Sequence, residues 1–181
     1  MVGSGWRKAF PGKQWPGART PFTPVLSLKQ QAEYMKICIV SSCGGHLTEV
    51  RCLKPAYGPY EHFYVLNDRA LLPPDMERKT FFITHSERDW KFLVNLWEAW
   101  RILHREKPDV ILSTGAGPAV PFALIGRLLF RTKVIFVETI TGIEAPSLTG
   151  RIMYFLAHRF FYQWPALAKA YPRGVYGGLL L

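Results

Sequence analysis

A short apolar run that ends in a pair of glycines constrains the fold of this chain more than any other stretch. Residues 36–47 read KICIVSSCGGHL, so a β-branched run comes directly before Gly44, Gly45 and His46. Such a run predicts a strand buried on both faces, and the glycines permit a tight turn into a helix over 46–57. The turn offers backbone N–H groups to an anionic ligand, although it matches neither the GxGxxG nor the GxxxxGK[ST] pattern.

Segments typical of strands and helices alternate along the rest of the chain. Further strands are predicted over 61–67, 80–84, 109–113, 133–137 and 159–163. Helices are predicted from an N-cap at Ser86 to about Lys107 and over 119–131, whereas 141–150 reads as a loop and 151–158 as an apolar segment. This alternation predicts an α/β fold, a Rossmann-like parallel sheet flanked by helices.

The length of 181 residues and the 49% hydrophobic content favour a single folded domain. Residues 1–34 are rich in Gly, Pro and basic side chains, so we predict a tail there and a domain over 35–181. Met35 is a candidate start for the compact protein. No stretch reaches the roughly 18 consecutive apolar residues of a membrane-spanning helix, so any membrane attachment is expected to be peripheral.

The net charge of +10 invites a nucleic-acid interpretation, but its distribution argues against one. The segment 1–34 carries +4, and the remaining +6 is scattered without a dense stripe of Lys and Arg. With 14% aromatic residues, six of them Trp, the composition better suits an anionic membrane surface. Cys38, Cys43 and Cys52 show no CxxC spacing, which predicts reduced thiols in a cytosolic compartment and no zinc site.

Three features are expected at the edge of the sheet where the parallel strands end. His46 follows the first strand, 114–117 repeats the glycine turn after the strand 109–113, and Glu138 follows the strand 133–137. The two glycine turns can hold a diphosphate, while His46 or Glu138 can take a proton from a hydroxyl group. Simpler alternatives remain open: a His46 that only caps the helix or bonds a neighbouring carbonyl, glycines needed only for a tight turn, and a solvated Glu138.

Five blocks in order carry a resemblance to a known family: MKICIVSSCGGHLTEV, DVILSTGAGPAVPFAL, KVIFVET, PSLTGR and FFYQWP. They resemble the PssD-type subunits of bacterial exopolysaccharide synthesis. Those subunits are similar to the membrane-anchoring subunit of the eukaryotic two-subunit dolichol-linked N-acetylglucosaminyltransferase and to the amino-terminal half of MurG-type GT-B glycosyltransferases. The resemblance covers Met35 to about Gly178 and leaves 1–34 outside.

The resemblance implies one half of a split, inverting, metal-independent glycosyltransferase that needs no cofactor. This half would hold a polyprenyl-diphosphate-linked sugar at the cytoplasmic face of the inner membrane, as a peripheral or monotopic protein, while a PssE-type partner presents the UDP-sugar. The implied acceptor-binding residues are Gly44, Gly45, Thr114, Gly115, Ala116 and Gly117, and the implied catalytic residues are His46 and Glu138. The bacterial branch implies transfer of glucuronate from UDP-glucuronate. The open alternatives are an N-acetylglucosaminyltransferase subunit and a non-catalytic membrane scaffold that recruits the catalytic subunit.

Overall fold

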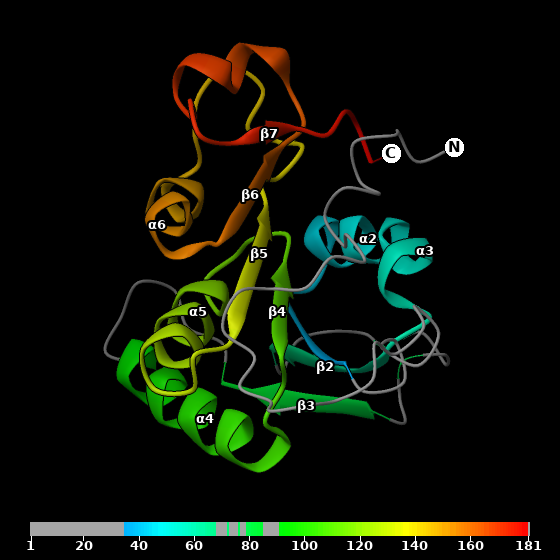
Figure 1. Cartoon of the computed structure of the whole chain (residues 1–181), viewed down its shortest axis with the longest axis vertical. Helices are drawn as coiled ribbons and strands as arrows, with labels where there is room; N and C mark the ends of the chain where they lie inside the picture. The colour runs from blue at the N-terminus through cyan, green and yellow to red at the C-terminus, as the bar shows by residue number, and fades with distance from the viewer. Residues whose placement is uncertain (1–34, 68–71, 73–75, 77–78, 85–90, 181) are drawn as a thin grey trace, which may run out of the picture.

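The computed structural model describes residues 35–67, 72, 76, 79–84 and 91–180, and within them it contains one seven-stranded sheet (Figure 1). The strand order is β3-β2-β1-β4-β5-β6-β7, and every neighbouring pair is parallel. The strands are β1 (Lys36–Ser41), β2 (Glu61–Asn67), β3 (Thr80–Ile83), β4 (Val110–Ser113), β5 (Lys133–Val137), β6 (Arg159–Tyr162) and β7 (Val175–Tyr176). The predicted parallel α/β sheet is confirmed. Its order reverses between β1 and β4, and sheets of this type bind ligands beyond the strand ends at such a point.

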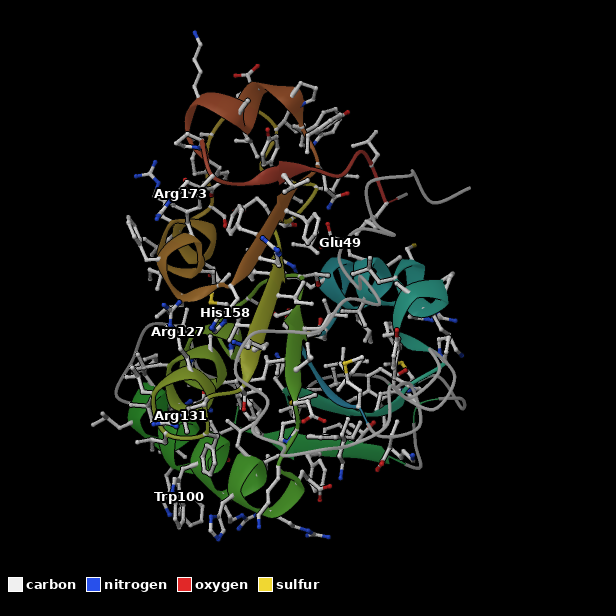
Figure 2. All side chains as sticks on the ribbon, in the orientation of Figure 1. Glu49, Trp100, Arg127, Arg131, His158 and Arg173 are labelled. Atoms are coloured by element: carbon white, nitrogen blue, oxygen red, sulfur yellow. The ribbon has the colours of Figure 1, made fainter. Side chains whose placement is uncertain are left out.

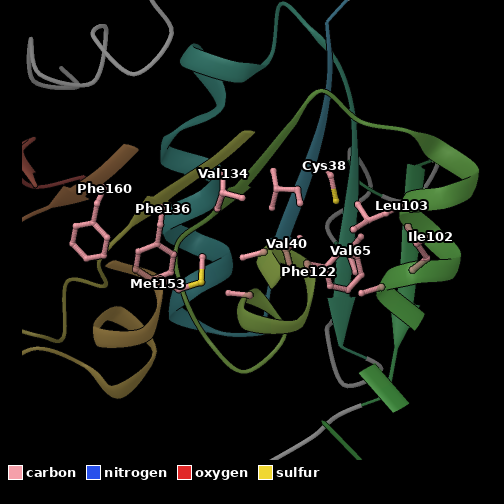
Figure 3. Close-up of a cluster of buried hydrophobic side chains, with 14 of the residues drawn as sticks. Cys38, Val40, Val65, Ile102, Leu103, Phe122, Val134, Phe136, Met153 and Phe160 are labelled. Atoms are coloured by element: carbon pink, nitrogen blue, oxygen red, sulfur yellow. The ribbon is translucent and has the colours of Figure 1, made fainter. Parts of the chain in front are cut away.

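Helices cover both faces of the sheet (Figure 1). On one face lie α2 (Gly45–Cys52) and α3 (Lys54–Tyr57), and on the other lie α4 (Lys91–Glu106), α5 (Ala119–Leu128) and α6 (Leu148–Leu156). Successive side chains of β1 alternate between the two layers. Cys38 and Val40 pack in the cluster with α4, α5 and α6 (Figure 3), while Ile37 and Ile39 pack with α2 and α3. Burial on both faces explains why residues 37–40 of this strand are all apolar.

Several boundaries differ from those predicted. The single helix expected over 46–57 is two helices, because Pro55 stands in the first turn of α3 and cannot donate a backbone hydrogen bond. The expected loop contains the start of α6, where the Ser147 side chain caps the helix by accepting from the Gly150 N–H at 2.8 Å. The two-residue strand β7 and the 3-10 helix η3 (Pro165–Lys169) were not predicted, being too short to show a period.

Two of the sequence predictions lie outside the described residues. They are the tail over 1–34 and the N-cap at Ser86. The division into a tail and a domain over 35–181 therefore stays a prediction. Within the part of the chain that the structure describes, none of the helices combines the length and apolar character needed to cross a membrane.

Candidate functional site

The first glycine turn joins the end of β1 to the start of α2. Gly44 has φ 75° and ψ −137°, a backbone conformation that residues with a side chain rarely adopt. A Cβ atom at Gly44 or Gly45 would meet none of the described residues within 4 Å, so these residues leave the space beside the turn open. No side chain of the described residues caps α2, so none of them occupies its first N–H groups, which suit an anionic ligand.

The second glycine turn joins β4 to α5. Gly115 has φ 128° and Ala116 has φ 72°. The value at Ala116 is unusual for a residue with a side chain, and backbone strain of this kind is concentrated at functional sites. The Gly115 N–H donates to the Ser113 Oγ at 3.2 Å, and Gly117 is exposed at the tip of the turn. Since β1 and β4 are paired, the two glycine turns lie at adjoining strand ends.

His46 connects the two turns. Its Nδ1 lies 3.2 Å from the Thr114 carbonyl oxygen, and the Thr114 hydroxyl donates to the His46 carbonyl at 2.9 Å. A Cβ atom at Gly115 would lie 2.8 Å from Cε1 of His46, so only a glycine lets the imidazole pack against this turn. Residues 68 positions apart are thereby held together, and this arrangement brings His46 to both glycine turns.

The contacts of His46 determine which ring nitrogen carries the proton. Nδ1 faces the carbonyl oxygen of Thr114 at 3.2 Å and the Oε2 atom of Glu49 at 3.5 Å, and neither group can donate. The proton of the neutral imidazole therefore belongs on Nδ1. Nε2 keeps its lone pair, and the side chain is 27% exposed. His46 is thus arranged as a proton acceptor that a ligand in the site can reach.

Glu138 lies at the end of β5, where it was predicted, but its side chain is fully buried. The solvated Glu138 considered as an alternative is therefore wrong. Its Oε2 accepts a hydrogen bond from the Tyr171 hydroxyl at 2.7 Å, and Gly150 of α6 packs against the carboxylate. Burial raises the pKa of Glu138, and hydrogen bonds from Ser147 and Tyr171 oppose this effect in part. The surroundings suit a group that braces α6 against the sheet.

Sequence reasoning missed two residues of the site. Glu49 lies on α2 one turn after His46, and Gln163 follows β6; both side chains are buried. The Gln163 amide donates to the Glu49 Oε1 at 3.1 Å and to the Glu138 carbonyl at 3.0 Å. The spacing of three between His46 and Glu49 on a helix could have predicted their proximity. No sequence spacing pointed to Gln163, because the residues it contacts, Glu49 and Glu138, are distant from it in the sequence.

The site thus combines open backbone N–H groups, a reachable imidazole and a buried carboxylate. These groups suit the binding of a diphosphate and the removal of a proton from a hydroxyl. Among the described residues, no group of three or more His, Cys, Asp or Glu side chains is placed to hold a metal ion.

Comparison with known proteins identifies the family. The model of the family described as "Oligosaccharide biosynthesis protein Alg14 like" matches residues 85–180, more than half of the chain. The chain belongs to the Alg14-like family. It is 29% identical over 183 residues to the human UDP-N-acetylglucosamine transferase subunit ALG14, and the alignment covers 82% of this chain and 84% of that relative. The subunit of the same name from Yarrowia lipolytica is 36% identical over 88 residues, which cover 46% of this chain and 41% of the relative.

Solved structures place the Alg14-like chain in a wider group of folds. MurG from Acinetobacter baumannii superposes with a TM-score of 0.61 at 17% identity, over 72% of this chain and 42% of MurG. The UDP-GlcNAc 2-epimerase from Methanocaldococcus jannaschii gives a TM-score of 0.61 at 16% identity, over 77% of this chain and 42% of that enzyme. The predicted Rossmann-like unit of a GT-B fold is confirmed, and the Alg14-like chain spans about two fifths of either structure.

The relatives also decide between two sequence-based interpretations. The names of these relatives agree with the alternative of an N-acetylglucosaminyltransferase subunit better than with glucuronate transfer in exopolysaccharide synthesis. The resemblance to the eukaryotic subunit and to MurG is thereby confirmed, whereas the PssD-type assignment stays a prediction.

Proposed function

We propose that this Alg14-like chain is the acceptor-binding subunit of an inverting glycosyltransferase that transfers N-acetylglucosamine from its UDP-sugar to a polyprenyl-diphosphate-linked sugar. The observation that carries this proposal is the position of His46, whose Nε2 is free beside two glycine turns at the point where the strand order reverses. The names of the relatives support the choice of donor.

The proposed reaction is a single displacement. The turns at Gly44 and at 114–117 hold the acceptor diphosphate through backbone N–H groups. His46 Nε2 takes the proton of the acceptor hydroxyl as its oxygen attacks the anomeric carbon of the donor sugar. A glycosidic C–O bond forms between the acceptor oxygen and the anomeric carbon. The bond from that carbon to the diphosphate of UDP breaks, and UDP leaves. Attack opposite to the leaving group inverts the anomeric configuration.

A partner subunit completes the site in this proposal. The described residues hold one Rossmann-like sheet and the chain matches 42% of MurG, so we propose that a second unit binds the UDP-sugar. The partner proposed is a donor-binding subunit of the kind that the PssE-type resemblance implies. Both subunits would work at the cytoplasmic leaflet, where the lipid-linked acceptor is embedded.

The donor is tested by measuring sugar transfer with the chain and its copurified partner. We expect transfer to a polyprenyl-diphosphate-linked sugar from UDP-N-acetylglucosamine at least about tenfold faster than from UDP-glucuronate, because one well-made polar contact in a donor site discriminates by that factor or more. Faster transfer from UDP-glucuronate would favour the PssD-type alternative. Full activity from the isolated chain would contradict the split site.

A non-catalytic scaffold is the second candidate, and the site geometry opposes it. A scaffold has no need for an imidazole held between two glycine turns or for the left-handed backbone at Ala116. If the chain only recruits its partner, substitutions at His46 and Gly115 will leave transfer unchanged as long as both subunits still copurify.

The outer surface of the helical layer α4–α5–α6 supplies a membrane-binding face in this proposal. We call it the aromatic face. Its exposed apolar side chains are Leu93, Trp97 and Trp100 on α4, Leu128 and Leu129 at the end of α5, and Ile152 and Phe155 on α6. Arginines accompany them: Arg101 lies over the Trp97 ring at 5.1 Å, and Arg127, Arg131 and Arg173 line the same side of the molecule as Trp100 (Figure 2). Apolar area and positive charge together favour an anionic leaflet.

We predict that Trp97→Glu weakens binding to vesicles of anionic phospholipid by about tenfold or more, because a buried Trp contributes about 1.5–3 kcal/mol and the new charge opposes anionic lipid. Vesicle cosedimentation at low salt measures this. Val175→Glu on β7, which lies at the far end of the sheet from α4 (Figure 1), is the matched control and should bind as the wild type does. Equal loss in both variants, or no sedimentation of the wild type, would contradict the aromatic face.

A further inference from the structure

Glu49 is a buried carboxylate whose two oxygens have different surroundings. Oε1 accepts hydrogen bonds from the Ile140 N–H at 2.6 Å, the Gln163 amide at 3.1 Å and the Thr139 hydroxyl at 3.4 Å. These donors belong to the segments that follow β5 and β6. They hold the carboxylate in one orientation and satisfy one of its oxygens.

The other oxygen, Oε2, faces His46. It is buried, makes no hydrogen bond with any residue that the structure describes, and lies 3.5 Å from the imidazole Nδ1. Leaving a buried carboxylate oxygen without a donor is costly, so such an atom calls for an explanation. Nδ1 already donates toward the Thr114 carbonyl, which makes Oε2 a second acceptor on the same side of the ring.

We propose that Glu49 is a positioning residue for His46. Its Oε2 keeps the imidazole proton on Nδ1, so that Nε2 stays free, and its negative charge stabilises the imidazolium that forms when Nε2 takes the acceptor proton. This inference rests on the proposed function for the role of Nε2. The contacts are suited to it, since the Thr114 carbonyl and Glu49 Oε2 are both acceptors facing Nδ1, and a charged ring gains further from a carboxylate at 3.5 Å.

A purely structural role is the competing explanation. Through Oε1 alone, Glu49 could hold the segment at Ile140 against α2. The two roles separate in the variant Glu49→Gln. The amide oxygen takes the place of Oε1, because Ile140 and Gln163 are donors, and the amide NH2 group then faces Nδ1 of His46. The structural contacts survive, but a donor replaces the acceptor beside the ring.

The test is nitrogen NMR of the histidine rings in the full chain, combined with transfer kinetics of the complex with its partner. In alkaline buffer the wild type should show His46 protonated on Nδ1. In Glu49→Gln the Nε2–H form should appear, and kcat should fall by at least about tenfold with little change in KM for the acceptor, as for other orienting carboxylates. Glu98→Gln is the matched control, because Glu98 is also a hydrogen-bonded helix carboxylate but serves Thr84 and Asn95.

The outcomes are distinguishable. If NMR of the wild type shows His46 protonated on Nε2, the inference is overturned. This result needs no variant, so it holds even if Glu49→Gln fails to fold. The inference would also be overturned if Glu49→Gln changed the His46 tautomer and kcat no more than Glu98→Gln does. Absence of transfer in the wild-type complex would count against the proposed function alone, since the NMR result does not depend on activity.

Discussion

His46→Ala should lower the rate of sugar transfer by at least about a hundredfold, the usual contribution of a positioned general base. The variant removes the ring whose Nε2 is free to accept the hydroxyl proton, while the contact from the Thr114 hydroxyl to the backbone carbonyl at position 46 remains. The measurement is transfer by the complex with its partner at saturating substrates. The melting temperature of the variant shows whether the fold is retained.

Two controls accompany His46→Ala. His104→Ala removes a histidine from the helical layer, where the ring stacks on Trp100, and should leave transfer unchanged. Glu138→Gln tests the other catalytic candidate; because this carboxylate is buried against Tyr171, we expect the variant to keep more than about a tenth of the activity. A wild-type rate for His46→Ala would refute the base assignment, and a hundredfold loss in Glu138→Gln would transfer that role to Glu138.

Gly150→Ala should lower the free energy of unfolding by about 3–5 kcal/mol, a large part of the stability of a domain of this size. A Cβ atom at position 150 would overlap the Oε2 of Glu138 and lie 2.6 Å from the Tyr171 hydroxyl. The methyl group must displace a buried carboxylate from its hydrogen bond or push α6 away from the sheet. Denaturant unfolding followed by circular dichroism measures the loss.

Gly45→Ala is the matched control for Gly150→Ala, because a Cβ atom there meets no described residue within 4 Å and the stability should change by less than about 1 kcal/mol. Combining Gly150→Ala with Glu138→Ala should cost less than the sum of the two single changes, since the second change makes room for the methyl group. A Gly150→Ala protein as stable as the wild type would show that Glu138 does not lock α6 in place.

The strands were predictable because the sheet is buried on both faces. The five strands predicted after the first apolar run all agree with observed strands to within one residue at each end. The predicted order along the chain also implied that His46 and 114–117 meet at one edge. Boundaries near proline and very short elements were not predictable, because a single residue or a tertiary contact sets them, as Pro55 and β7 show.

The sequence by itself determined the layer architecture and the two glycine turns, because these depend on local properties: apolar runs and backbone freedom at Gly44 and Gly115. Only the tertiary structure decided what the acidic groups do. Glu138 is buried against Tyr171 and Gly150, and Glu49 is the carboxylate beside the imidazole. The physical reason is that the role of a carboxylate depends on its burial and on donors from distant segments, such as Ile140 and Gln163 for Glu49.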